Sequence, residues 1–80
     1  MDENKNKVIE ILKKYTFNES VWDNYTENSK IIVDLKINSA RIVDIILDVE
    51  DEYGIVIDDY LLEKLITIKD ILDIIEQKRK

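Results

Sequence analysis

Apolar residues recur every three or four positions in three stretches of the chain, which is the spacing of an amphipathic helix. The expected buried positions are Val8, Ile11, Leu12 and Tyr15 in the first stretch, Ile42, Ile45, Ile46, Val49 and Tyr53 in the second, and Ile68, Ile71, Leu72 and Ile75 in the third. The second stretch, roughly residues 39–53, lacks the strict alternation that a half-buried strand needs. The pattern therefore predicts an all-α fold.

Polar residues and one glycine mark the ends of these helices. Asp2 and Glu3 precede the first helix, where the helix dipole favours acidic side chains. Gly54 follows the second helix, at the place of a left-handed C-cap. Thr67 and Asp70 form a shortened capping box at the start of the last helix. These signals predict where each helix begins or ends.

The segment between the first two helices, residues 16–38, shows no helical period and is predicted to be a long loop. A short helical turn is expected around residues 19–25. The apolar residues expected to fasten the loop to the core are Phe17, Val21, Trp22 and Tyr25.

Asp58 and Asp59 are placed to cap a brief helix before the last one, and this helix is expected to carry Tyr60, Leu61 and Leu65. Residues 1–80 are therefore predicted to form a single domain. Its architecture is a small four-helix bundle with a long loop between helices one and two and a short third helix.

Composition narrows the possible functions. The chain has 80 residues, 18 acidic and 12 basic, so its net charge of −6 disfavours nucleic acid and anionic membranes and favours partners with a basic patch. It contains no Cys and no His, which excludes thiol nucleophiles, disulfides and the usual zinc ligand sets. Its small size favours a binding or carrying role over catalysis. We expect a cytoplasmic protein, because no secretory or transit signal and no membrane span is visible. We also expect it to be a monomer.

A second, weaker apolar stripe lies on the predicted helix over residues 39–53. It consists of Ala40, Val43 and Leu47, rotated away from the core stripe by a quarter to a third of a turn. The carboxylates that frame it are Asp44, Asp48 and Asp51. They lack the spacing of an EF-hand, so a specific metal site is not expected. An exposed apolar strip between acidic residues predicts a surface for docking a partner.

Asn38 and Ser39 precede the same helix. Taken locally, Ser or Asn at this place is first of all a helix N-cap. The wider pattern adds another interpretation. Asp34-Leu35-Lys36-Ile37-Asn38-Ser39-Ala40 leads into a helix that ends in acidic residues and Tyr53, and Leu65-Ile66-Thr67-Ile68-Lys69-Asp70 opens the last helix. In order and spacing this arrangement resembles the acyl carrier protein family.

The resemblance implies that Ser39 accepts a 4'-phosphopantetheine arm from coenzyme A through a separate phosphopantetheinyl transferase, which supplies the base and Mg²⁺. The arm's thiol would then hold an acyl or aminoacyl group as a thioester. The implied partners are this transferase, a loading ligase and downstream synthase enzymes with basic patches. The implied docking residues are Asn38, Ala40, Arg41, Val43, Asp44, Leu47, Asp48 and Asp51.

Four residues depart from the family's usual pattern. Lys36 stands where the family usually has Gly, Asn38 where it has Asp, Ala40 where it has Leu, and Arg41 where an acidic or neutral residue is common. These departures indicate a stand-alone carrier of a specialised pathway rather than of housekeeping fatty-acid synthesis. The alternative is a noncovalent helical interaction module that keeps the fold and uses Ser39 only as a cap.

Overall fold

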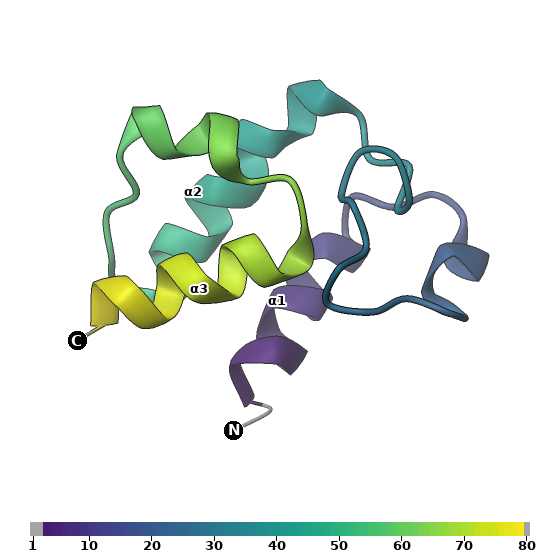
Figure 1. Cartoon of the computed structure of the whole chain (residues 1–80), viewed down its shortest axis with the longest axis horizontal. Coiled ribbons are helices and arrows are strands. Elements are labelled where there is room, and N and C mark those ends of the chain that lie inside the picture. Colours follow the sequence, from purple (N-terminus) through teal and green to yellow (C-terminus); the bar gives the residue numbers. More distant parts are fainter. Residues whose placement is uncertain (1–2, 80) are drawn as a thin grey trace.

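Three α-helices carry the fold, and short 3₁₀ helices connect them (Figure 1). The computed structural model describes residues 3–79, so Asp2, predicted to precede the first helix, lies outside the described residues. The elements in chain order are α1 (Glu3–Lys13), η1 (Glu19–Trp22), η2 (Ser39–Arg41), α2 (Ile42–Tyr53), η3 (Asp59–Lys64) and α3 (Ile68–Arg79). No strand occurs within residues 3–79, which confirms the predicted fold class.

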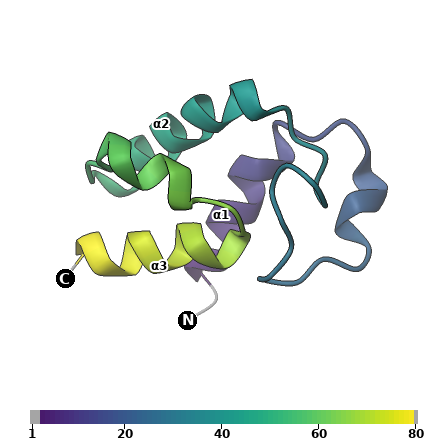
Figure 2. The ribbon, with the colours of Figure 1, turned by 45° about the horizontal axis from the view of Figure 1, so that its top comes forward.

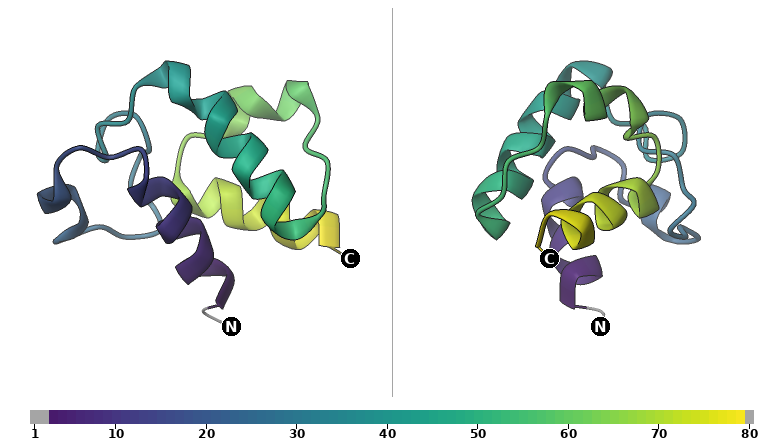
Figure 3. Two further views of the ribbon diagram at one scale, coloured as in Figure 1. Left: turned by 180° about the vertical axis from the view of Figure 1, so that it is seen from behind. Right: turned by 60° about the vertical axis from the view of Figure 1, so that its left-hand side comes forward.

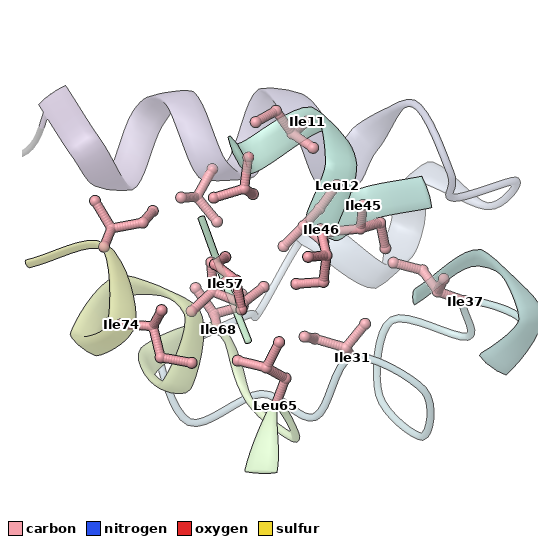
Figure 4. Close-up of a cluster of buried hydrophobic side chains, with 14 of the residues drawn as sticks. Ile11, Leu12, Ile31, Ile37, Ile45, Ile46, Ile57, Leu65, Ile68 and Ile74 are labelled. Atoms are coloured by element: carbon pink, nitrogen blue, oxygen red, sulfur yellow. The ribbon is translucent and has the colours of Figure 1, made fainter. Parts of the chain in front are cut away.

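Helix α1 contacts both α2 and α3, and η3 lies between α2 and α3 in the view of Figure 2. The side chains of all three helices meet in one apolar core, part of which Figure 4 shows. The buried residues of this core are Val8, Ile11, Leu12, Ile31, Leu35, Ile37, Ile45, Ile46, Val49, Ile57, Leu65, Ile68, Ile71, Ile74 and Ile75. Each side chain of this size stabilises the fold by roughly 1.5–3 kcal/mol when it is fully buried.

The predicted helix ends agree well with the structure at Gly54 and Thr67. Gly54 has a φ of 62° and ends α2 in the left-handed conformation, which a residue without Cβ adopts without steric cost. The backbone N–H of Thr67 donates to the Asp70 carboxylate over 2.9 Å, and the backbone N–H of Asp70 donates to the Thr67 hydroxyl over 3.2 Å. The expected capping box is therefore formed.

The predicted buried stripe of α3 needs one correction. Ile74 is buried, whereas Leu72 is only half-buried. At 100° per residue, Leu72 lies about 90° from the centre of the buried stripe and Ile74 about 70°.

Helix α1 ends at Lys13, before Tyr15, whose ring is half-buried against the core.

The long loop is more deeply embedded than its lack of periodicity suggests. Its η1 turn falls within the expected range, and Val21, Trp22 and Tyr25 pack against the core as predicted. Phe17 does not: its side chain is 98% exposed, so its predicted role as a core anchor is wrong.

The second half of the loop supplies Ile31, Leu35 and Ile37 to the core, each only 1% exposed. Three backbone hydrogen bonds join this part of the loop to the start of α3. Their donor and acceptor pairs are Ile31 N–H to Ile66 O (2.9 Å), Ile68 N–H to Ser29 O (3.2 Å) and Lys69 N–H to Glu27 O (2.8 Å). The loop therefore closes the end of the bundle opposite the C-terminus (Figure 3).

The predicted short third helix exists as the 3₁₀ helix η3. Asp58 occupies its N-cap position but makes no side-chain capping bond, and its carboxylate instead pairs with Lys78 at 3.2 Å. Capping by the Asp58 side chain was therefore a wrong prediction. Leu65 follows η3 and is buried, whereas Tyr60 within it is 67% exposed. None of the helices in residues 3–79 has the length and apolarity needed to cross a bilayer.

Candidate functional site

The site begins with the turn that leads into η2. Lys36 has a φ of 59°, a left-handed conformation that costs an L-residue about 1–2 kcal/mol and that glycine adopts freely. This is the position at which the acyl carrier protein pattern usually has Gly. The neighbours Leu35 and Ile37 are both buried and hold the turn in place despite the lysine.

Asn38 caps the helix start. Its side-chain oxygen accepts a hydrogen bond from the backbone N–H of Ala40 over 2.9 Å. Its backbone oxygen accepts one from the N–H of Arg41 over 2.8 Å. Replacing Asp by Asn at this position thus preserves the cap, because the amide oxygen performs the same acceptor role.

Ser39 is the first residue of η2 and is exposed. Among residues 3–79, its hydroxyl has no hydrogen-bond partner, while the capping oxygen belongs to Asn38. The local interpretation of Ser39 as the N-cap is therefore wrong. The structure leaves this hydroxyl uncommitted at the surface, as a modification site requires.

The stripe beside Ser39 on α2 is exposed as predicted. Val43 is 53% and Leu47 56% accessible, and Ala40 is also exposed. Since Val43 and Leu47 are four residues apart, they lie next to each other on the helix surface. Their use in docking remains a prediction.

Two of the three framing carboxylates have partners within the chain. Asp44 pairs with the Arg41 guanidinium at 2.7 Å. Asp48 accepts a hydrogen bond from the Tyr15 hydroxyl over 2.5 Å and pairs with the Lys14 ammonium at 3.2 Å. The apolar stripe of α2 did not indicate the partners of Asp48, because Lys14 and Tyr15 lie in the turn after α1, far away in sequence. Asp51 is exposed and has no ion-pair partner among residues 3–79.

The contact between Tyr15 and Asp48 perturbs both groups. The hydrogen bond to Asp48, with a smaller contribution from burial, raises the pKa of Tyr15 to about 12. The same hydrogen bond lowers the pKa of the Asp48 carboxyl, and Lys14 adds to that effect. The Asp48 carboxylate therefore also links α2 to the turn after α1.

Two hollows each have a lining residue in η2 or at the start of α2. A hollow of mixed polarity, about 370 Å³ in volume, is lined by Lys14, Tyr15, Phe17, Asn38 and Arg41. An apolar hollow of about 290 Å³ is lined by Lys30, Ile32, Val33, Ile42, Leu62, Glu63, Leu65 and Ile66.

Asn38 and Arg41 line the first hollow, and Ile42, three residues after Ser39, lines the second. Sequence reasoning missed both hollows. The adjacent apolar pair Ile32 and Val33, exposed in the loop, was the available signal for the second.

The acidic residues do not gather into a metal centre. Within residues 3–79, no group of three carboxylates is arranged to hold a metal ion, and the chain has no His or Cys. The chemistry that this region offers is therefore that of the exposed Ser39 hydroxyl.

The chain is similar in sequence to several acyl carrier proteins. It is 45% identical to that of Thermotoga maritima over 53 residues, which cover 66% of this chain and 65%, just under two thirds, of that protein. It is 43% identical to that of Campylobacter hominis, with coverage of 66% and 67%.

With the acyl carrier protein of Rickettsia canadensis the chain shares 33% identity over 79 residues, which cover 98% of this chain and 88% of that protein. No family model matches the chain. A similarity that extends over nearly the whole chain, together with the helical fold, establishes the family of the chain. The chain belongs to the acyl carrier protein family, a family of carriers rather than enzymes.

Proposed function

We propose that this protein carries an acyl group on a 4'-phosphopantetheine arm attached to Ser39. The observation that carries the proposal is the exposed Ser39 hydroxyl, which the helix start does not need because Asn38 supplies the capping oxygen. The arm would contribute the thiol that the chain lacks, since the sequence contains no Cys.

The attachment transfers the phosphopantetheine group of coenzyme A to the Ser39 oxygen. The Ser39 oxygen forms a bond to the phosphorus that bears the pantetheine of coenzyme A, and the bond from that phosphorus to the second phosphate breaks. Adenosine 3',5'-bisphosphate leaves, and the hydroxyl proton passes to a base of the transferase. The chain itself contributes the hydroxyl, which belongs to the first residue of η2.

The cargo we favour is an acyl chain rather than an aminoacyl group. Ile42, three residues after Ser39, lines the apolar hollow together with Ile32, Val33 and Ile66. An apolar surface of this kind stabilises a hydrocarbon chain by removing it from water, whereas a charged amino group gains nothing there. The departures at Asn38, Ala40 and Arg41 support a specialised pathway.

Partner enzymes would dock on α2. Val43 and Leu47 supply exposed apolar contact, and Asp51, with Asp44 and Asp48 when their internal pairs open, supplies orientation toward a basic patch. Charge complementarity of this kind raises the encounter rate more than the affinity, so the complexes should form quickly and dissociate quickly.

The test is incubation with coenzyme A and a broad-specificity phosphopantetheinyl transferase, read by intact mass. The natural chain should gain the mass of one arm, and Ser39→Ala should gain none. Ser20→Ala is the matched control, because Ser20 is also exposed in a 3₁₀ helix that an Asn caps, and it should be modified like the natural chain. An arm on the Ser39→Ala protein would refute the assignment.

A noncovalent interaction module is the second candidate, and the charge pattern beside Ser39 favours it. Asn38 lacks the carboxylate usual at its position, and Arg41 adds a cation. In this case no transferase would modify the chain, and Ser39→Ala would leave partner binding intact. The mass experiment thus separates the two functions.

A further inference from the structure

Lys36 keeps a strained backbone conformation three residues before Ser39. With a φ of 59°, it is the one non-glycine residue among residues 3–79 that has a positive φ. Strained residues of this kind cluster at functional sites, where the surrounding structure must hold them in place. The buried side chains of Leu35 and Ile37 do so here, and Lys36 itself is exposed. The turn therefore presents a lysine where the fold alone would favour glycine.

The Lys36 ammonium has no ion-pair partner within the chain. Six ion pairs occur among residues 3–79, and Lys36 belongs to none of them. The carboxylate of Asp34 instead accepts a hydrogen bond over 2.7 Å from the backbone N–H four residues earlier. Arg41, the next cation along the chain, is paired with Asp44. Of the two cations that flank Ser39 in sequence, Lys36 is thus the one available to an added anion.

Asn38 offers neutral donors directly beside Ser39. Its side-chain oxygen accepts the hydrogen bond from the Ala40 N–H, so the role of each end of the amide is fixed. The Nδ2 group donates no hydrogen bond within residues 3–79, and Asn38 is exposed. A carboxylate at this position would repel a phosphate on the neighbouring serine, whereas the amide brings two N–H donors. We call Lys36 and Asn38 the donor pair.

We propose that the donor pair holds the phosphodiester of the arm attached to Ser39. This inference rests on the proposed function. Three residues span at most about 10 Å, a distance that the flexible four-carbon stem of lysine and a phosphate on the serine can close from opposite ends. Hydrogen bonds between an ammonium and a phosphate are charge-assisted and stronger than neutral ones. The donor pair thereby positions the base of the arm and leaves its thiol end free to move.

The experiment compares each protein with and without the arm. Thermal unfolding gives the change in Tm that attachment produces, and ³¹P NMR gives the chemical shift of the phosphodiester. Attachment should raise Tm by about 2–4 °C more in the natural chain than in Lys36→Gln, as expected for an exposed charge pair in a domain of this size. The phosphorus signal should also differ between these two proteins. Asn38→Asp should reduce the gain in Tm, and Lys36→Arg should keep both properties.

Lys36→Gly separates backbone strain from contact with the phosphodiester. Without the arm, this variant should be more stable than the natural chain, because glycine adopts a φ of 59° freely. On attachment it should show the smaller gain in Tm expected of Lys36→Gln. A merely structural role of Lys36 would not reduce that gain.

Lys78→Gln is the matched control. Lys78 lies in the last turn of α3, at the end of the molecule away from η2 (Figure 1), and pairs with Asp58 in both forms of the protein. Its loss should leave the gain in Tm and the phosphorus signal as in the natural chain.

Two results would contradict these proposals in different ways. If the arm raises Tm equally in the natural chain, Lys36→Gln and Lys36→Gly, and the phosphorus signal is the same in all three, the donor pair does not hold the phosphodiester, although the attachment stands. If no transferase attaches the arm to the natural chain, the proposed function itself is wrong.

Discussion

The starts of α3 and of η2 contain similar residues that serve different purposes. At α3 the Thr67 hydroxyl accepts a hydrogen bond from the Asp70 N–H, and the Asp70 carboxylate accepts from the N–H groups of Ile66 and Thr67. At η2 the Asn38 side chain caps alone, and the Ser39 hydroxyl has no partner among residues 3–79.

This difference separates a hydroxyl that stabilises the fold from one that is available for reaction. At the α3 start, the Thr67 hydroxyl and one oxygen of the Asp70 carboxylate together accept three backbone N–H bonds. The η2 start obtains its cap from Asn38, one residue earlier, so a substitution at Ser39 removes no capping hydrogen bond. Substitutions at the two starts test whether this division holds.

Asp70→Ala should have the largest effect on stability. Its carboxylate accepts two backbone N–H bonds, each of 2.9 Å, and hydrogen bonds to a charged acceptor contribute more than neutral ones. We expect the free energy of unfolding to fall by about 2 kcal/mol in urea titrations followed by circular dichroism. A loss no greater than that of an exposed substitution elsewhere on α3, such as Asp73→Ala, would contradict the assigned role.

Asn38→Ala should come next, with a loss of about 1 kcal/mol, because the Ala40 N–H loses its capping acceptor. Asn38→Asp is the matched variant, since it keeps an acceptor at the same place, and it should retain or exceed the natural stability. Equal destabilisation by both variants would show that the amide does more than cap.

Tyr15→Phe should cost about 0.5–1 kcal/mol at neutral pH, because the Asp48 carboxylate loses its hydroxyl donor. The folded-state pKa of Asp48 is lowered, so this contribution is present above the ordinary value of 3.8 and disappears as pH falls through the lower folded value.

At alkaline pH, this contribution to stability changes because Tyr15 itself titrates. Its pKa is raised from 10.0 to about 12 in the folded protein, so the contribution is complete below pH 10 and is lost as pH rises toward 12. Unfolding free energies of both proteins, measured across pH, should therefore converge at both ends. A constant difference down to strongly acidic pH would exclude the ionised Asp48 as the partner.

Ser39→Ala should have the smallest effect, within about 0.5 kcal/mol of the natural chain. Thr67→Ala, the same loss of a hydroxyl at the other helix start, should cost about 1 kcal/mol. Thermal and urea unfolding of the two variants side by side measure the difference directly. A similar loss in both would mean that Ser39 supports the helix start after all.

The periodic parts of the fold followed from the sequence because regular helices impose a regular pattern. The stripe of Ile45, Ile46 and Val49, the cap at Gly54 and the box at Thr67 were all predictable in this way. Ile31 was not, because irregular backbone has no period that would distinguish a buried side chain from an exposed one.

Phe17 is the opposite case in the same loop, an apolar residue that is exposed. Its hydrophobicity indicated burial, yet the tertiary arrangement leaves it 98% exposed. At the candidate site, the exposure of Val43 and Leu47 followed from a helical wheel. The partners of Asp44 and Asp48 did not, because ion pairs depend on which elements meet in space. Which of Asn38 and Ser39 caps was also beyond the sequence, since both residue types suit the position.

The backbone bonds between residues 27–31 and 66–69 have a consequence for how the molecule opens. Because one partner of each bond lies in α3 or just before it, we expect the loop and α3 to open together. The amides of Ile31, Ile68 and Lys69 should then exchange with deuterium at rates close to one another, with protection approaching that of the global unfolding reaction. The surface around Ser39 would in this way remain assembled for as long as the whole domain does.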